Sequence, residues 1–305
     1  MSCLSATIQR GDLMIETYFK NETSTFGLSL GDCVEVMSQI ADAGFHFDMV
    51  FADPPYFLSN GGISVQSGKQ VCVDKGEWDK SQGTEQDLMF TRKWLNAVRG
   101  ILKPSGTIWI SGTHHNIFQI AHCLTELGYK ILNVITWQKT NPPPNLSCRY
   151  FTYSTEFIVW ARREKSIPHL YNYELMKAIN GGEQMRDVWT MPAIGRWEKH
   201  FGKHPTQKPL HLLCRILLAA TNERDWVLDP FTGSSTTGIA CTLLNRRFLG
   251  IDREKAFLDL SIKRQKECQD PGIKQNYRRR IPDLQCINNC NDMHEGIEEY
   301  GERLF

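Results

Sequence analysis

Asp53-Pro54-Pro55-Tyr56 combines the residue types best suited to chemistry in this sequence. It follows an apolar run at 47–52 that predicts a buried strand, so Asp53 stands where open α/β sheets bind their ligands. Pro54 and Pro55 have no N–H group, and their carbonyls are free to accept hydrogen bonds from an amine, as is the Asp53 carboxylate. Fixed acceptors of this kind orient the lone pair of an aromatic amine toward an electrophile. Tyr56 adds a ring on which a base can stack.

On its own this segment could also be an ordinary strand-ending turn, and a second segment favours the chemical interpretation. Asp229–Gly238 follows a short apolar strand at 226–228, and its small residues suit a tight loop that leads into a helix. Gly233 lets the backbone turn against a ligand, and Gly238 lets the helix approach the sheet. Asp252 lies 23 residues after Asp229, the spacing at which a carboxylate contacts ribose hydroxyls in nucleotide sites. The segment therefore predicts a site for an adenosine-containing cofactor.

Two shorter segments could complete the cofactor site. His204–Pro209 (HPTQKP) offers small polar groups of the kind that a methionine carboxylate and ammonium need, although Thr206 could equally be a helix N-cap. Gly31-Asp32-Cys33 follows a predicted strand and offers a carboxylate for an adenine amine, although it could equally be a surface turn. The predicted cofactor-binding residues are Asp32, Cys33, Thr206, Lys208, Asp229, Phe231, Gly233, Ser234, Ser235 and Asp252.

The composition limits the class of protein. With 305 residues, 41% of them apolar, the chain can bury one large core with an insertion or two modest ones. A net charge of +1 excludes a broad basic surface but not a local nucleic-acid-binding stripe. The ten Cys lack the spacing of a disulfide framework, which predicts reduced thiols and a cytoplasmic location. Neither a secretory signal nor a long uncharged apolar run occurs, so no membrane association is expected.

Seven apolar segments alternate with helical patterns, which predicts an α/β fold with a doubly wound, mostly parallel sheet. The predicted strands are 27–31, 47–52, 107–111, 132–137, 156–161, 226–228 and 247–251. Apolar residues at helical spacing predict helices at 94–102, 210–220, 236–244 and 254–266.

The remaining stretches set the predicted domain organisation. Residues 1–26 are expected to form a loosely attached N-terminal arm, and residues 27–265 one catalytic domain. Within that domain, residues 57–83 directly follow Asp53–Tyr56 and are expected to form a mobile loop. Long loops beside a site are usually functional. Residues 162–203 predict an insertion rich in basic and aromatic residues, and 266–305 predict a polar C-terminal tail.

The three motifs D-P-P-Y, H-P-T-Q-K-P and D-P-F-x-G-S together resemble the S-adenosylmethionine-dependent amino-methyltransferases of DNA, in the permuted β-class order. The resemblance covers about residues 28–265. It is closest to the DpnA type of adenine methyltransferase, which accompanies DpnII-type GATC restriction-modification systems. Further matching segments lie at 51–63, 74–80, 137–142, 145–152 and 202–209. The family fold is a Rossmann-like, seven-stranded sheet with one antiparallel strand.

The resemblance implies a role for each matching residue. Asp53 to Tyr56 would form a catalytic clamp on adenine N6, flipped out of the DNA stack, to which S-adenosylmethionine gives a methyl group. The resemblance also implies the residues that contact the cofactor. Asp32 would contact the adenine and Asp252 the ribose, and Phe231 and Gly233 would lie beneath the cofactor. Thr206 and Lys208 would lie near its methionine end. The chain departs from the family at Ser235, which stands at the second Gly of F-x-G-x-G. This costs backbone freedom if φ must be positive there.

By family position, residues 162–203 would recognise the DNA target. From 162 to 208 the chain has nine Lys and Arg against five Asp and Glu, an excess that could contact phosphates. Arg186, Arg196 and Lys199 are candidate DNA-binding residues, although each could equally belong to a solvated face. The implied partner is DNA, duplex or single-stranded. A homodimer and a cognate restriction endonuclease are left open.

Two other functions compete with adenine methylation. N4-cytosine methylation uses the same clamp, and Asp at the first clamp position favours adenine. A catalytically silent DNA-binding protein is the second alternative, against which the intact Asp53 and Tyr56 argue. The sequence has no Pro-Cys dipeptide, which disfavours a C5-cytosine methyltransferase. Cys286, Cys290 and His294 do not match a common zinc spacing, so no metal site is expected.

Overall fold

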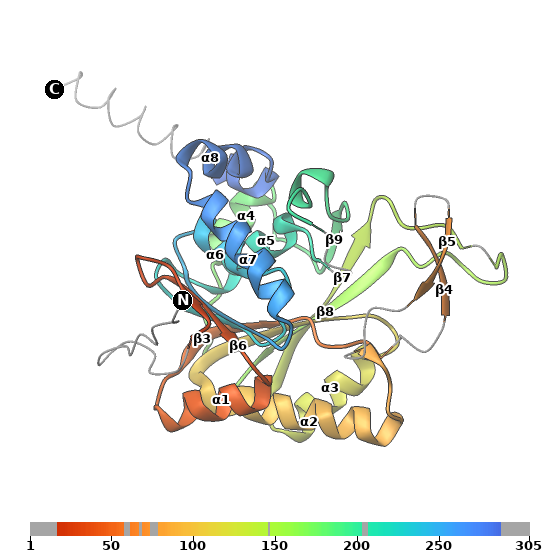
Figure 1. Cartoon of the computed structure of the whole chain (residues 1–305), viewed down its shortest axis with the longest axis horizontal. Helices are drawn as coiled ribbons and strands as arrows, with labels where there is room; N and C mark the ends of the chain where they lie inside the picture. The colour runs from red at the N-terminus through yellow and green to blue at the C-terminus, as the bar shows by residue number, and fades with distance from the viewer. Residues whose placement is uncertain are drawn as a thin grey trace.

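The computed structural model describes residues 17–57, 62–66, 69–73, 79–145, 147–202 and 207–287. A nine-stranded sheet runs through the molecule, with helices on both of its faces (Figure 1). In spatial order its strands are β1 (Phe19–Lys20), β2 (Phe26–Leu30), β11 (Arg247–Asp252), β10 (Trp226–Asp229), β3 (Phe47–Ala52), β6 (Leu102–Gly112), β8 (Thr155–Arg162), β7 (Lys130–Lys139) and β9 (Val188–Met191). A separate antiparallel ribbon consists of β4 (Gly62–Gln66) and β5 (Lys69–Val73).

The directions of the strands confirm the predicted mostly parallel sheet. From β2 through β11, β10 and β3 to β6, each strand is parallel to its neighbour. β8 is antiparallel to both β6 and β7, and it is the one reversed strand among the seven that the sequence predicts. β1 and β9 extend the two edges. The sequence did not predict them, because β1 has only two residues and β9 lies in a segment of basic and aromatic residues without a strand period.

Two layers of helices bury the sheet (Figure 1). One face is covered by α1 (Cys33–Asp42), α2 (Thr84–Ile101) and α3 (Ile117–Glu126). The other carries α4 (Tyr173–Ile179), α5 (Leu210–Ala220), α6 (Thr236–Leu243), α7 (Lys255–Cys268) and α8 (Pro271–Arg279). The predicted helices agree with α2, α5, α6 and α7 to within a few residues, apart from the first ten residues of α2.

The central strand β3 shows why the clamp segment is held firmly. Met49 and Phe51 pack into the core beneath α5 and α6, whereas Phe47, Val50 and Ala52 pack into the core beneath α1 and α2. All five side chains are at most 2% exposed. A strand that is buried on both faces has a continuous apolar sequence and little freedom at its end.

The two predicted terminal segments need correction. The strand β1 pairs with β2, so Phe19–Lys20 and Phe26 of the predicted arm belong to the sheet. At the other end, the predicted tail begins inside α7, and Ile281 and Leu284 are fully buried in the core. Both segments are mostly polar, and a few apolar anchors in a polar segment give no recognisable period.

The two predicted internal insertions contain regular structure. Within 57–83, which the sequence predicts as a mobile loop, residues 62–66 and 69–73 form the hairpin of β4 and β5. Within 162–203 lie α4, the edge strand β9 and a short 3-10 helix, η2 (Arg196–Glu198). No helix in the described part of the chain is long and apolar enough to cross a membrane.

Candidate functional site

A pocket of about 260 Å³ lies at the C-terminal edge of the parallel strands. Four adjacent strands end there: Asp252 and Asp229 are the last residues of β11 and β10, and Gly31 and Asp53 directly follow β2 and β3. All four residues line the pocket. The helices that follow β10 and β3 cover opposite faces of the sheet. This is the switch point at which α/β sheets bind ligands, as the sequence predicted for Asp53.

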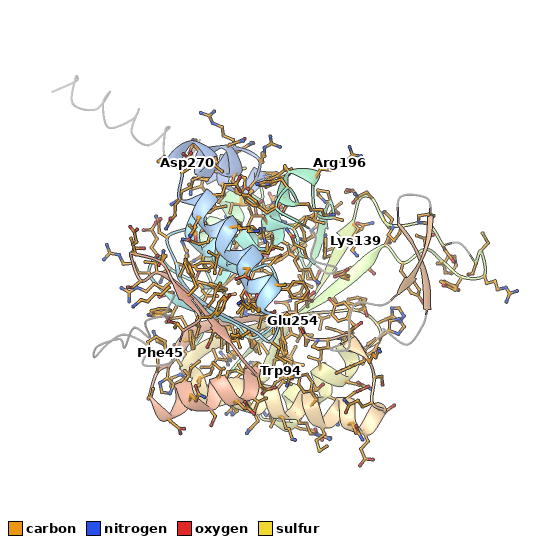
Figure 2. The ribbon with its side chains drawn as sticks, in the orientation of Figure 1. Phe45, Trp94, Lys139, Arg196, Glu254 and Asp270 are labelled. Atoms are coloured by element: carbon orange, nitrogen blue, oxygen red, sulfur yellow. The ribbon has the colours of Figure 1, made fainter. Side chains whose placement is uncertain are left out.

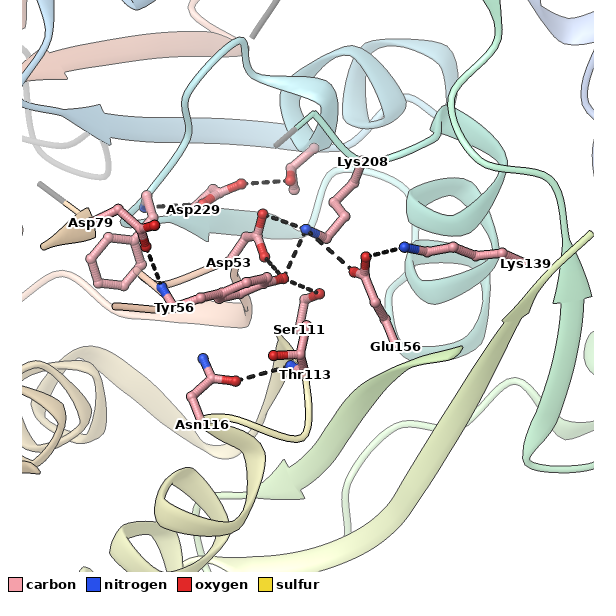
Figure 3. Close-up of polar contacts among 12 residues, drawn as sticks. Asp53, Tyr56, Asp79, Ser111, Thr113, Asn116, Lys139, Glu156, Lys208 and Asp229 are labelled. Carbon is pink, nitrogen blue, oxygen red and sulfur yellow. Dashed lines mark hydrogen bonds and ion pairs between the residues drawn. The ribbon is translucent and has the colours of Figure 1, made fainter. Parts of the chain in front are cut away.

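Asp53, Tyr56 and Lys208 form a buried hydrogen-bonded triangle in this pocket (Figure 3). The Tyr56 hydroxyl donates to Asp53 Oδ1 at 2.7 Å, and Lys208 Nζ donates to Asp53 Oδ2 at 2.6 Å. Lys208 Nζ also donates to the Tyr56 hydroxyl at 3.0 Å. The resemblance implies a place for Lys208 at the methionine end of a cofactor. In the structure its ammonium lies in the same pocket and donates to the clamp carboxylate.

The charges around the triangle determine its protonation. Burial, with the charge of Asp53 added, raises the pKa of Tyr56 well above its usual value, so the hydroxyl stays protonated and can donate. Burial acts to lower the pKa of Lys208, but Asp53 and Glu156 outweigh it and raise this pKa well above its usual value. Lys208 therefore stays an ammonium. Glu156 Oε2 lies 3.7 Å from Lys208 Nζ, and Glu156 Oε1 pairs with Lys139 (Figure 3).

Asp79 fixes the backbone of the clamp segment. Its Oδ1 accepts hydrogen bonds from the backbone N–H groups of Tyr56 at 2.7 Å and Phe57 at 2.9 Å. The Asp79 residue is fully buried, and Phe57 has φ of 56°, a left-handed conformation that a bulky residue adopts only when its surroundings impose it. The carboxylate therefore holds the turn that presents Pro54, Pro55 and Tyr56 to the pocket.

The second half of the pocket is the loop between β10 and α6. Gly233 has φ of 49° and donates its N–H to Asp252 Oδ2 at 2.8 Å, which confirms that the loop turns sharply there. Asp229 accepts hydrogen bonds from Thr237 at 2.6 Å and from the Phe231 N–H at 3.1 Å. Burial raises the pKa of Asp229 to about 7 and also raises the pKa of Asp252.

The lining chemistry of this half fits an adenosine-type cofactor. The ring of Phe231 is fixed by an edge-on contact with Trp94, at a centroid distance of 5.4 Å, and provides an apolar surface. Each Asp252 oxygen already accepts one backbone N–H, from Gly233 and from Glu254, and keeps a lone pair for a ribose hydroxyl. The pocket continues from these residues to Asp53, so a cofactor and an amine could share it.

Other predicted cofactor residues have structural roles. Asp32 does not line the pocket: it caps α1 by accepting from Val34 N and Glu35 N, and it pairs with Arg253. Its neighbours Gly31 and Cys33 form the pocket wall instead, and burial raises the pKa of Cys33 to about 12. Thr206 lies outside the described residues, as do Cys290 and His294.

Ser234 and Ser235 differ from each other. Ser234 lines the pocket, while Ser235 is fully buried, does not line it and shares a hydrogen bond with Thr232 at 2.9 Å. Ser235 has φ of 54° and ψ of 44°. The backbone freedom that the family Gly provides is therefore needed at this position, as the sequence suggested.

The three predicted DNA-binding residues lie outside the pocket. Arg186 is exposed and lies two residues before β9. Arg196 is the first residue of η2, and Lys199 directly follows this helix. Figure 2 shows Arg196 on the side of the molecule that carries α8, apart from Glu254 at the pocket. The neighbouring Trp197 packs edge-on against Tyr277 of α8, at 5.1 Å. The structure thus joins the inserted region to the C-terminal helix.

Sequence reasoning missed several residues that support the clamp. Glu156 stands at the start of the antiparallel strand β8, and Ser111 Oγ lies 3.3 Å from the Tyr56 hydroxyl near the end of β6. Asp79 comes 23 residues after Tyr56 in the chain. Glu156 could have been noticed as a carboxylate at the start of an otherwise apolar strand. Its place beside the pocket, however, can be inferred only when the strand order is known.

Comparisons with known proteins agree with this geometry. A family model described as DNA methylase, of the N6 and N4 type, matches residues 47–263. Type II methyltransferase M2.MboI from Moraxella bovis is 51% identical over 88% of this chain and 97% of its own length. Type II methyltransferase M2.DpnII from Streptococcus pneumoniae is 59% identical over 71% of this chain and 81% of its own length.

Solved structures share the fold. The crystal structure of an M1.HpyAVI–SAM complex has a TM-score of 0.61 and 28% identity, and the match covers 79% of this chain and 98% of the other. The cytosine-N4-specific PvuII DNA methyltransferase has a TM-score of 0.60 at 17% identity, over 86% of this chain and 93% of the other. The latter likeness concerns the fold alone.

Proposed function

Because this chain belongs to the N6 and N4 family of DNA methylases, we propose that it methylates adenine N6 in DNA, within GATC, with Asp53, Tyr56 and Lys208 as its catalytic centre. The observation that carries this proposal is the carboxylate of Asp53, which is only 12% exposed and is held on both oxygens directly after β3. It lies in the pocket that Phe231, Gly233 and Asp252 also line. The chain is a DNA methyltransferase, and its cofactor is S-adenosylmethionine.

In the proposed mechanism, the clamp accepts hydrogens from the target amine. Asp53 keeps acceptor capacity on both oxygens, because each oxygen has two lone pairs and receives one hydrogen bond in the triangle. The carbonyls of Pro54 and Pro55 provide further acceptors in the pocket wall. These acceptors turn the amine lone pair out of the base plane, and Asp53 takes up the proton that the amine releases.

The other residues of the pocket bind the cofactor and orient the target base. Bound S-adenosylmethionine supplies an electrophilic methyl group on its sulfonium. Phe231 and Asp252 would hold the adenosine part, and the ring of Tyr56 supports the target base. Lys208 provides a fixed positive charge beside Asp53 and is paired further with Glu156, so the carboxylate can be buried without water.

The choice of adenine and of GATC rests on the sequence relatives. The fold does not distinguish adenine from cytosine, since a cytosine-N4-specific enzyme has a similar TM-score. Two relatives above 50% identity are Type II methyltransferases of the MboI and DpnII systems, which supports adenine in GATC and a role in restriction-modification. A cognate endonuclease as functional partner, a homodimer and a cytoplasmic location belong to the same proposal.

The test is the Asp53→Ala variant. Nucleoside mass spectrometry of methyl-free DNA, incubated with wild-type protein and S-adenosylmethionine, should show N6-methyladenine, and oligonucleotides with altered GATC sites should lose it. Asp53→Ala should reduce turnover at least about 100-fold, because the clamp loses its charged acceptor, while cofactor binding changes little. N4-methylcytosine as the product would overturn the base assignment, and turnover near the wild-type rate would overturn the clamp.

A further inference from the structure

Three aromatic rings that the pocket does not use lie together on the surface. His114 and Tyr153 are stacked nearly in parallel, with centroids 4.4 Å apart and an interplanar angle of 13°. The Tyr150 ring is 5.5 Å from that of Tyr153. Tyr150 and Tyr153 are 58% and 57% exposed, and the adjacent Phe151 is 95% exposed. Contiguous exposed aromatic surface of this kind marks a binding site more often than a solvated face.

The segment that carries these rings is ordered by its own hydrogen bonds. Asn145 Oδ1 accepts from Ser147 N at 3.0 Å and Ser147 Oγ at 2.8 Å, and Asn145 Nδ2 donates to the Tyr150 carbonyl. Asn141 Oδ1 accepts from Ala193 N at 2.9 Å, which ties the segment to the inserted region. These bonds hold the backbone around Tyr150, and stacking on His114 holds the ring of Tyr153. Such order before a ligand binds reduces the entropy lost on binding.

Two of the rings, His114 and Tyr153, lie close to the clamp along the chain. His114 comes three residues after Ser111, which contacts the Tyr56 hydroxyl. Tyr153 comes three residues before Glu156, which faces Lys208. Three residues span at most roughly 11 Å of chain, or about three base steps of a nucleic-acid strand. Figure 1 shows the connection between β7 and β8 extending from the body of the molecule at this edge of the sheet.

We propose that His114, Tyr150, Phe151 and Tyr153, here called the aromatic platform, stack on an unpaired base of the DNA strand next to the target adenine; this rests on the proposed function. A base flipped into the clamp leaves the faces of its neighbours open, and aromatic rings stack on any base. Between Lys139 and Thr155 the chain carries Arg149 and no Asp or Glu, which suits a phosphate backbone.

The experiment compares Phe151→Ala/Tyr153→Ala with wild-type protein, and Met89→Ala is the control. Met89 is also an exposed apolar residue, but it lies on α2, outside both the inserted region and the pocket. With S-adenosylhomocysteine present, the Kd for a labelled GATC oligonucleotide, single-stranded and duplex, should rise roughly 5- to 100-fold in the double variant. It should stay within about twofold of wild type in the control, and the Kd for S-adenosylmethionine should not change in either.

Crosslinking tests the contact without a variant. Wild-type protein is irradiated with an oligonucleotide that carries 5-bromouracil in place of the GATC thymine, which follows the target adenine. Mass spectrometry should place the crosslink on Tyr150, Phe151 or Tyr153.

The outcomes separate this proposal from the proposed function. The aromatic platform alone is overturned if wild-type protein forms N6-methyladenine but the Kd for DNA is unchanged in the double variant. A crosslink outside Tyr150, Phe151 and Tyr153 has the same meaning. If wild-type protein methylates no DNA, both proposals fail. A wild-type dimer that the double variant dissociates in sedimentation, with no crosslink to the rings, would make this surface an interface between two copies of the chain and overturn the proposal.

Discussion

At the scale of single residues, Asp53 depends on its counter-charge. A carboxylate with only 12% of its side chain exposed is tolerated when opposite charge and donors surround it. Lys208, with an exposed side-chain fraction of 7%, provides both, and Tyr56 provides the second donor. The H-P-T-Q-K-P segment therefore contributes to the clamp, 152 residues after Tyr56 in the chain.

Replacing Lys208 distinguishes a clamp role from a cofactor role. We expect Lys208→Met to lower kcat roughly 100-fold or more, with little change in the Kd for S-adenosylmethionine, because Asp53 loses its fixed positive neighbour. Lys208→Arg should restore part of kcat, since it keeps the charge. Steady-state kinetics and isothermal titration calorimetry measure the two quantities. A weakened Kd with normal kcat would place Lys208 at the methionine end of the cofactor instead.

Asp229 makes the stability of the fold depend on pH. Its pKa of about 7 in the folded protein exceeds the ordinary 3.8, so the native state holds a proton that the unfolded state has lost between about pH 4 and pH 7. Stability from this group is thus present at the acid end and declines as pH rises through 7. We expect wild type to lose up to ~3 kcal/mol more than Asp229→Asn between pH 5 and pH 8. Urea unfolding at both pH values measures this, and parallel losses would contradict it.

At the scale of elements, the start of α6 combines three backbone requirements. Gly233 and Ser235 both take positive φ, and Gly238 lies against the sheet. A left-handed conformation costs about 1 kcal/mol for a residue with a side chain, so Ser235 is strained where the family has Gly. The strain is tolerated because α6 is buried on nearly all sides between the sheet, α5 and α7.

Gly238 should be the least replaceable residue of α6. A Cβ there would lie 2.5 Å from the rings of Phe26 and Phe248. We expect Gly238→Ala to destabilise the fold by about 1–3 kcal/mol through overpacking. Gly100→Ala in α2 is the control: nothing lies within 4 Å of its added Cβ, and a gain of up to about 1 kcal/mol is expected from helix propensity. Thermal unfolding of both variants tests this, and equal shifts would contradict the packing argument.

At the scale of the whole molecule, the C-terminal segment completes the core. Ile281 and Leu284 are fully buried, and Asp283 between them bonds to α5. Arg215 donates to Asp283 at 2.8 and 2.7 Å, and His211 Nε2 lies 2.9 Å from it. Burial acts to raise the pKa of Asp283, but these partners lower it to about 2. A segment predicted as a polar tail is therefore an anchor.

Removing this anchor should destabilise the whole fold. We expect Asp283→Ala to cost about 3–5 kcal/mol in the free energy of unfolding, because Arg215 is left with an unpaired buried charge. Glu126→Ala breaks the exposed pair with Arg92 and should cost at most about 1 kcal/mol. Chemical denaturation compares the two. A loss for Asp283→Ala no larger than that for Glu126→Ala would show that the segment is dispensable.

The sequence by itself determined the parts of this protein that depend on local order. Apolar runs predicted the seven strands. The segments that follow two of them, Asp53–Tyr56 and the small residues around Gly233, predicted the ligand-binding edge of the sheet. These features follow from backbone sterics and from burial on both faces, which act within a few residues. The family resemblance then identified a methyltransferase from short motifs alone.

Only the tertiary structure decided which distant residues meet. Lys208, Glu156, Asp79 and Ser111 come together around Asp53 because strand order places their segments at one edge of the sheet, and no local period encodes that order. The same holds for Asp283 and the short edge strands, which a few long-range contacts stabilise. Asp32, conversely, had a suitable type and position, but the fold uses its carboxylate to cap α1 and to pair with Arg253.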